Sequence, residues 1–228
     1  MKLKLLITGL ALLVSASPSF AGGIMMMGGG VAATGSSDPL YDFEETGTPG
    51  GWDVVTGSPN FDYTTVHLAD SESLAIPTSS DRAGVSFTGS DTVYISFQIQ
   101  YPTLPGLTSG CVEIYDSANS TLLGTFSVRT TGNMQAQAAG GSANNGTPAL
   151  TAGNTMYVKI RMVKGTESNA DASFTVWGSS DGTNWTQAAT STNGTTTAQP
   201  AYARFKTSSE VAVYDTVKIS ASDITDAR

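Results

Sequence analysis

The side chains that most often carry catalysis are scarce in this sequence of 228 residues, which holds one histidine and one cysteine. A structural or catalytic zinc site built from such residues needs several ligands, so His67 and Cys111 cannot supply one. A lone cysteine also excludes an intrachain disulfide, and a Ser-His-Asp triad could draw only on His67. These counts exclude most metal-hydrolase and thiol-redox chemistry.

Paired carboxylates are the next chemistry to consider, because glycan hydrolysis needs two of them across the cleaved bond. The closest pair in an alternating segment is Glu113 and Asp116. Residues three apart in a regular strand point to opposite faces, so this pair cannot meet at one bond. The sequence therefore predicts no catalytic residues.

The charge balance limits the partners. The chain has 19 acidic and 11 basic side chains and a formal net charge of -8. Such a field repels phosphate backbones and anionic membrane surfaces, which argues against a nucleic-acid partner.

The beginning of the chain is typical of export. Residues 1–21 combine an early Lys2 and Lys4, an apolar run and a Ser19-Phe20-Ala21 end, which predicts a signal peptide and a secreted, extracellular protein of bacterial type. The apolar run is too short to serve as a membrane anchor. Residues 22–38 are rich in glycine and methionine, which indicates a flexible lead-in. Its apolar patch could alternatively dock a protein partner.

Residues 39–228 show the period of two that is typical of half-buried strands. In segment 92–100, Val93, Ile95, Phe97 and Ile99 share one face. Turn-forming clusters separate further strands, and no window has a helical stripe. We expect one all-β, two-sheet antiparallel sandwich with a long surface loop at 139–154, and strands at 39–45, 60–66, 84–88, 92–100, 111–115, 122–129, 133–138, 157–163, 174–177, 201–206 and 211–219.

Several motifs, in this order, resemble those of concanavalin A-like and laminin G-like jelly-roll domains and of jelly-roll carbohydrate-binding modules. They are Tyr-Asp-Phe-Glu at 41–44, Gly-Trp at 51–52, the turn ending in Ser-Leu at 67–74, and the segments 154–160 and 213–219. The resemblance implies a jelly roll of the concanavalin A-like type.

The resemblance also defines what an enzyme of this kind would need. The hydrolases use a Glu-x-Asp-x-x-Glu type of strand, whose second Glu is missing after Glu113. Alginate-lyase-like sandwiches use an Arg-rich strand, a Gln-x-His and a Tyr-rich strand, and His67 lies in no such setting. We therefore expect a non-catalytic glycan-binding or adhesive module with a polysaccharide or cell-surface glycan as partner. The first alternative is a surface or virion-associated structural protein that acts as a spike, and the last is a polysaccharide hydrolase or lyase.

Aromatic side chains near loops are the candidates for sugar binding, because sugar rings stack on aromatic faces. The four candidates are Trp52, Tyr63, Tyr101 and Trp185. A role in packing the core or a turn is the alternative for Trp52 and Trp185.

Asp215 is the candidate for a metal ligand, because counting by twos places it in phase with Val213, Val217 and Ile219. A buried carboxylate needs a partner, and calcium is a hard cation that takes oxygen ligands. The resemblance implies one structural calcium ion between Glu44 and Asp215, with oxygens around Asp70 and Glu72 as supplements. The alternatives are a β-bulge that turns Asp215 outward or hydrogen bonds from backbone N–H groups.

Overall fold

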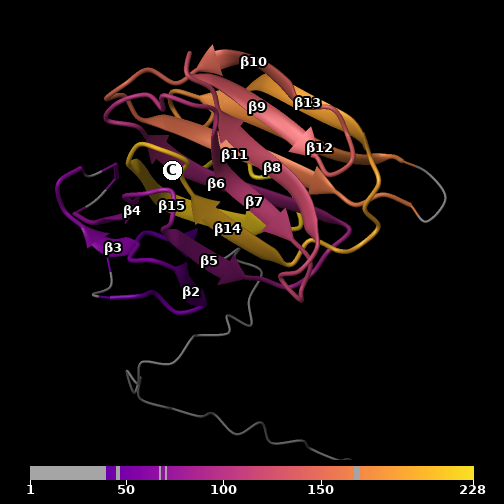
Figure 1. The fold of residues 1–228 in the computed structure, drawn as a ribbon, viewed down its shortest axis with the longest axis horizontal. Coiled ribbons are helices and arrows are strands. Elements are labelled where there is room, and N and C mark those ends of the chain that lie inside the picture. Colours follow the sequence, from indigo (N-terminus) through magenta and orange to yellow (C-terminus); the bar gives the residue numbers. More distant parts are fainter. Residues whose placement is uncertain (1–39, 45–46, 67, 70, 167–169) are drawn as a thin grey trace, which may run out of the picture.

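The computed structural model describes residues 40–44, 47–66, 68–69, 71–166 and 170–228, and all its regular elements are β-strands. They form two antiparallel sheets that pack face to face (Figure 1). The first sheet has the order β13 (Thr186–Gly194), β12 (Ala172–Ser179), β11 (Met156–Val163), β6 (Thr92–Gln100), β15 (Ala212–Ser220), β4 (Ser73–Ile76) and β3 (Asn60–Tyr63), with β1 (Leu40–Tyr41) also paired to β15. The all-β sandwich is confirmed.

The second sheet has seven strands. In Figure 1 they lie one above another, from β2 at the bottom to β10 at the top. Their order is β10 (Asn144–Ala149), β9 (Asn133–Ala138), β8 (Leu122–Val128), β7 (Ser109–Tyr115), β14 (Tyr202–Lys206), β5 (Arg82–Ser86) and β2 (Trp52–Thr56). Strands β7 and β14, almost ninety positions apart in the sequence, are neighbours in this sheet.

Each predicted strand has a counterpart, and those at 92–100 and 133–138 have the predicted bounds. The strand expected at 39–45 is the two-residue β1, and residues 42–44 are not part of a strand. Four strands were not predicted: β2, β4, β10 and β13. The expected surface loop at 139–154 is wrong in part, because β10 lies within it and pairs with β9 at the edge of the second sheet. An edge strand needs little apolar surface and tolerates proline, so its sequence does not alternate as a central strand does.

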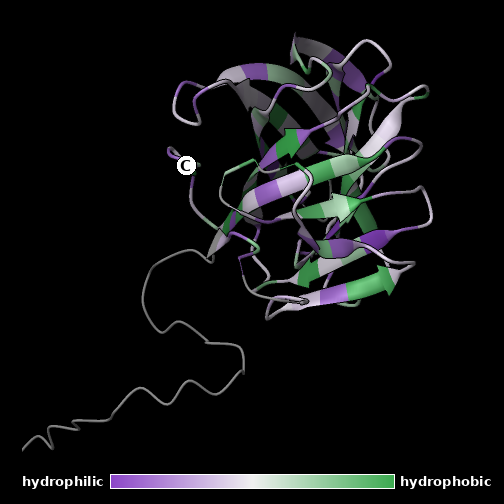
Figure 2. Cartoon of the chain, turned by 90° about the vertical axis from the view of Figure 1, so that its left-hand side faces the viewer, coloured by the Kyte–Doolittle hydropathy of each residue, from purple (hydrophilic) through white to green (hydrophobic). Residues whose placement is uncertain are grey.

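Aromatic rings from both sheets meet in the core. Phe97 of β6 lies between Phe126 of β8, Phe205 of β14 and Tyr214 of β15, with ring centroids 5.9, 5.7 and 5.9 Å away. The strands carry apolar and polar residues in alternation, as the mixed colours along them in Figure 2 show. Burial of one face of each sheet against the other therefore leaves the opposite faces available for polar side chains.

A β-bulge changes the phase of β15 and corrects the prediction for Asp215. Tyr214 and Ile219 pair with the inward residues Ile99 and Ile95, and the register shifts between Asp215 and Lys218. Asp215 pairs with Gln98 and so lies on the outer face, out of phase with Ile219. It is nevertheless fully buried.

The predicted signal peptide (1–21) and lead-in (22–38) lie outside the described residues. In the part of the chain that the structure describes, no helix has the length and apolarity that a membrane crossing requires.

Candidate active site

The paired strands β7 and β14 place a polar cluster on the outer face of the second sheet. Their alternation directs Val112, Ile114, Ala203 and Phe205 into the core. The residues that alternate with these point the other way, and they include Glu113, Tyr115, Arg204 and Lys206. We call these four residues the Tyr115 cluster.

Hydrogen bonds hold the Tyr115 cluster in one arrangement. The Tyr115 hydroxyl donates to Glu113 Oε2 at 2.9 Å and accepts from Arg204 Nη1 at 3.0 Å. Lys206 Nζ donates to Glu113 Oε1 at 2.8 Å. The Arg204 guanidinium also lies over the Tyr115 ring, 4.4 Å from its centroid. Because the Tyr115 hydroxyl is held by both Glu113 and Arg204, the phenol oxygen has a defined position and orientation.

The turn after β7 supports Arg204 from its other side. Arg204 Nη2 donates to Asn119 Oδ1 at 3.0 Å. Asn119 has a positive φ of 52°, which asparagine tolerates better than most residues. Asp116 closes the same turn by accepting hydrogen bonds from the backbone N–H groups of Ser120 and Thr121. Asp116 is therefore a turn residue.

The pKa values of Glu113 and Tyr115 are shifted in opposite directions. Burial by itself raises the pKa of Glu113, but the Lys206 ammonium and the Tyr115 hydroxyl outweigh burial and lower that pKa. Burial, followed by the charge of Glu113, raises the pKa of Tyr115. At neutral pH Tyr115 therefore keeps its proton, and Glu113 stays ionised as the acceptor of its hydrogen bond.

Strand β5 adds a third positive side chain, Arg82, near the Tyr115 cluster. The charge of Arg82 acts on Tyr115, whose pKa it lowers against the larger effect of burial. Gly84 allows Tyr202 to lie flat over β5, because a Cβ atom at Gly84 would stand 1.7 Å from the Tyr202 hydroxyl oxygen. Arg82, Arg204 and Lys206 together give this face a local excess of positive charge in an acidic chain.

A polar row continues across the sheet from this cluster. Arg204 pairs with Glu113, Glu113 with Thr125, and Thr125 with Gln137 of β9. In the other direction Arg204 pairs with Gly84, which pairs with Asp53 of β2. Strands are about 4.8 Å apart, so a row over six strands is roughly 24 Å long. This length suits an extended polymer better than a single small molecule.

The aromatic residues predicted to bind sugar have different surroundings. Trp52 and Tyr101 are buried in the core, 5% and 0% exposed, so neither ring presents a face to a ligand. For these two residues the prediction is corrected, because Trp52 packs on Phe43 and Phe205 and Tyr101 bonds to Ser109. Tyr63, at the end of β3, and Trp185 are partly buried. The structure does not bring these four aromatic residues together.

The residues predicted to hold calcium converge on one segment of chain. Asp215 accepts hydrogen bonds from Ala69 N at 3.2 Å and from Ser73 Oγ at 3.0 Å. Glu44 accepts from the backbone N–H groups of Ser71 and Glu72 at 2.8 and 2.9 Å. Asp70 lies outside the described residues. Among the residues that are described, no group of three or more His, Cys, Asp or Glu side chains forms a metal site.

The sequence reasoning missed the Tyr115 cluster. It tested Glu113 only against a second carboxylate and looked for a lyase only through a histidine. A signal was present, since Tyr202, Arg204 and Lys206 alternate with core residues in one strand and Glu113 and Tyr115 do so in another. The pairing of these two strands, which creates the cluster, is not visible in the sequence.

No protein-family model and no curated protein sequence matches this chain. Solved structures do match it. An endo-β-1,4-glucuronan lyase from the fungus Trichoderma reesei aligns with a TM-score of 0.59 at 11% identity, over 82% of this chain and 97% of that one. A marine alginate lyase of family PL-14 from Aplysia kurodai aligns with a TM-score of 0.51 at 8% identity, over 74% of this chain and 87% of that one.

An engineered GH43 glycoside hydrolase with endo-xylanase and exo-arabinofuranosidase activity aligns with a TM-score of 0.53 at 14% identity, over 82% of this chain but 41% of that one. The lyases are thus matched along nearly their whole length and the hydrolase along less than half. The expectation of a non-catalytic binding or adhesive module, with a spike protein as alternative, is therefore wrong.

These alignments and the strand order agree on the architecture. All three matched structures are glycan-active enzymes, and all three align over most of this two-sheet sandwich. The chain is accordingly a jelly-roll sandwich with the concanavalin A-like fold.

Proposed function

We propose that this protein is a polysaccharide lyase that cleaves an acidic, uronate-containing glycan by β-elimination. The observation that carries the proposal is the Tyr115 cluster, in which a phenol lies between a carboxylate that accepts its proton and a guanidinium that donates to its oxygen. The near full-length alignment with a glucuronan lyase and an alginate lyase supports the same reaction class.

Elimination from a uronate needs the removal of the proton on C5, which is acidic only when the neighbouring carboxylate is neutralised. The positive side chains around Tyr115 supply that neutralisation, and we assign it to Arg82, Arg204 and Lys206. Fixed charges in a partly buried site act more strongly than the same charges in water. A neutral glycan has no carboxylate for them to bind, so the substrate class follows from the charge of the site.

Tyr115 and Glu113 handle the protons. The Tyr115 oxygen takes the C5 proton while its own proton passes to Glu113, and Arg204 stabilises the charge that develops on the phenol oxygen. The C4–C5 double bond forms as the bond from C4 to the glycosidic oxygen breaks. The proton held by the pair is then returned to that leaving oxygen, so the products are an unsaturated uronate and a shortened chain.

The test is a panel of glycans incubated with the purified protein. We expect polyglucuronate or alginate to give the ultraviolet absorbance of an unsaturated uronate, and a neutral β-glucan to give none. An increase in reducing ends without that absorbance would show hydrolysis and contradict the proposal. No cleavage of any uronate polymer would contradict it as well.

We also propose that the protein is exported.

We further propose that its structural cofactor is a calcium ion held by Glu44 and Asp215, with oxygens near Glu72 in support. Calcium takes oxygen ligands, and the two carboxylates face the same segment. The residues beside them, Phe43 and Thr216, have positive φ angles of 59° and 44°. Such strained backbone is concentrated at functional sites, which supports a ligand at this point.

Calcium is expected to raise the melting temperature by an amount that grows with its concentration, because a ligand of the folded state stabilises it by mass action. Asp215→Ala should remove this dependence, whereas Asp53→Asn, a change of the same charge on the other sheet, should keep it. The measurement is a thermal melt in excess chelator and in increasing calcium. Equal melting temperatures in both conditions would rule out the ion.

A further inference from the structure

The first sheet carries a row of paired side chains on its outer face, on the side of the sandwich opposite to the Tyr115 cluster. Trp177 of β12 pairs with Lys159 of β11, Lys159 with Ser96 of β6, and Ser96 with Lys218 of β15. Lys159 Nζ lies 5.2 Å from the ring centroid of Trp177 and 4.9 Å from that of Trp185. We call these five residues the Lys159 groove.

The closing segment of the chain, residues 221–228, lies across the Lys159 groove. Asp223 Oδ1 and the carbonyl oxygen of Ile224 accept hydrogen bonds from Lys159 Nζ at 2.8 and 3.1 Å. The indole N–H of Trp185 donates to the carbonyl oxygen of Thr225 at 3.1 Å. Lys159 is only 4% exposed as a result. A lysine among aromatic rings is thus covered by an acidic segment of the same chain.

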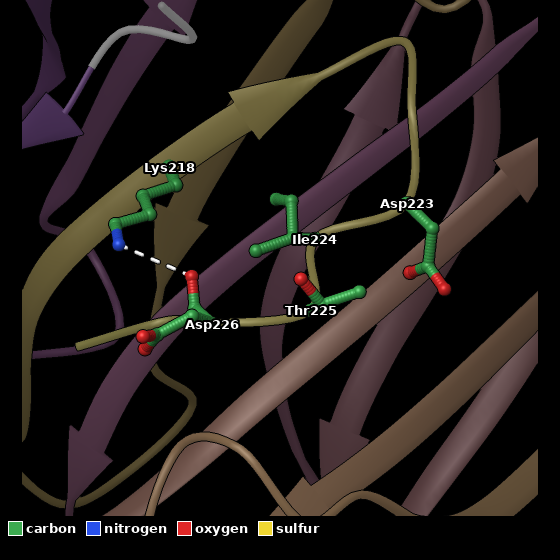
Figure 3. Close-up of a pocket in the computed structure, with 5 residues that line it drawn as sticks. All are labelled: Lys218, Asp223, Ile224, Thr225 and Asp226. Atoms are coloured by element: carbon green, nitrogen blue, oxygen red, sulfur yellow. Dashed lines mark hydrogen bonds between the residues drawn. The ribbon is translucent and has the colours of Figure 1, made fainter.

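Lys218 holds the far end of the closing segment, as Figure 3 shows for its bond to the carbonyl oxygen of Asp226 at 3.1 Å. A pocket of about 300 Å³ remains between Lys218 and residues 223–226. The closing segment therefore spans this part of the groove without filling it.

The groove also contains polar groups that the closing segment does not use. The hydroxyl of Ser96, a fully buried residue in the middle of the row, has no hydrogen-bond partner among the described residues. The same holds for Nε of Arg161, whose guanidinium lies 5.6 Å from the Trp177 ring centroid. A buried polar group without a partner is costly, so an unused hydroxyl beside two ammonium groups indicates that another ligand completes the site.

We propose that the Lys159 groove is a second binding site for an acidic oligosaccharide and that residues 221–228 are its displaceable occupant. The Asp223 carboxylate takes the position of a uronate carboxylate on Lys159, the indole faces offer stacking surfaces, and Ser96 bonds a sugar hydroxyl. The choice of a uronate rests on the proposed function, whereas the groove and its occupant do not. The site would hold the polymer on the face opposite to the cleaving one.

The experiment compares two full-length variants with the same change of charge, both in a Tyr115→Phe background that prevents cleavage. Asp223→Asn breaks the ion pair to Lys159, whereas Asp91→Asn breaks one to Lys164, outside the groove and outside residues 221–228. The probe is a short oligoglucuronate, followed by tryptophan fluorescence. Of the three tryptophans, Trp52 is in the core and the other two belong to the groove, and the Lys159→Gln variant identifies the part of the signal that comes from the groove.

We expect Asp223→Asn to bind the oligoglucuronate about tenfold more tightly than Asp91→Asn, because it raises the fraction of molecules with an open groove. Adding Lys159→Gln to Asp223→Asn should abolish the fluorescence change. Equal affinities of the two variants, or a change that survives Lys159→Gln, would overturn the proposal. Binding of a synthetic peptide with the sequence of residues 221–228 but not of the sugar would overturn it in favour of a peptide site.

Ser96→Ala provides a test that does not depend on replacing the buried lysine. Removing a buried hydroxyl without a partner should leave the melting temperature unchanged or higher. In the Asp223→Asn chain it should weaken oligoglucuronate binding several-fold. Unchanged binding in this folded variant would show that Ser96 faces no ligand and contradict the proposed site.

Discussion

Replacing Tyr115 with phenylalanine is expected to lower the rate of uronate elimination by about 10²- to 10⁴-fold, the usual range for the loss of a general acid or base. The change removes one oxygen, which donates to Glu113 and accepts from Arg204. The ring and its contact with the Arg204 guanidinium remain, so the fold and the charge of the site are kept. The loss should therefore appear in kcat much more than in KM.

The control for this variant is Tyr94→Phe, which removes a phenol oxygen from β6 in the other sheet. It should leave the rate unchanged, and both variants should melt within a few degrees of the unmodified chain. Elimination that continues at the full rate in Tyr115→Phe would show that another group takes the C5 proton and would refute the assignment of Tyr115.

The pH dependence of elimination provides a second check on the same pair. The pKa of Glu113 is lowered, so its carboxylate accepts the proton of Tyr115 down to a pH below the usual range of a glutamate. Activity should be lost on the acid side only as the pH falls through that lowered pKa. The stability that the ion pair with Lys206 contributes is lost in the same direction, since a lowered carboxyl pKa stabilises the folded state only above it.

Phe97→Ala is expected to lower the free energy of unfolding by about 3–5 kcal/mol, because it removes a large buried side chain. Phe97 is fully buried and contacts rings from three other strands, two of which belong to the opposite sheet. Its removal leaves a cavity where the two sheets meet, and the surrounding rings cannot close it fully. The measurement is equilibrium unfolding in denaturant.

Val54→Ala serves as the matched control, because Val54 is an apolar strand residue that is 51% exposed. It should change the free energy of unfolding by no more than about 0.5 kcal/mol. A similar small loss for Phe97→Ala would mean that the aromatic cluster does not hold the two sheets together.

The fold class could be read from the sequence because burial of one sheet face imposes a local period of two. Segment 92–100 alternates over its whole length, and the structure has a strand with the same bounds. Where that constraint is weak, prediction failed: β10 is an edge strand rich in Asn, Gly and Thr, and it lies in an expected loop. The bulge after Asp215 could not be predicted from the sequence either. An added residue in a strand reverses which side chains point inward, but it leaves the composition of the strand unchanged.

The sequence by itself determined an acidic chain without disulfides, poor in histidine, that alternates into a two-sheet sandwich. It also placed Glu113 and Asp116 on opposite faces of a regular strand. Only the tertiary structure decided which side chains lie together on each outer face: it places Tyr115 and Arg204 in adjacent strands, and Lys159 under residues 221–228. The physical reason is that alternation specifies which way a side chain points, whereas the partner of a strand depends on how two whole sheets bury their apolar faces.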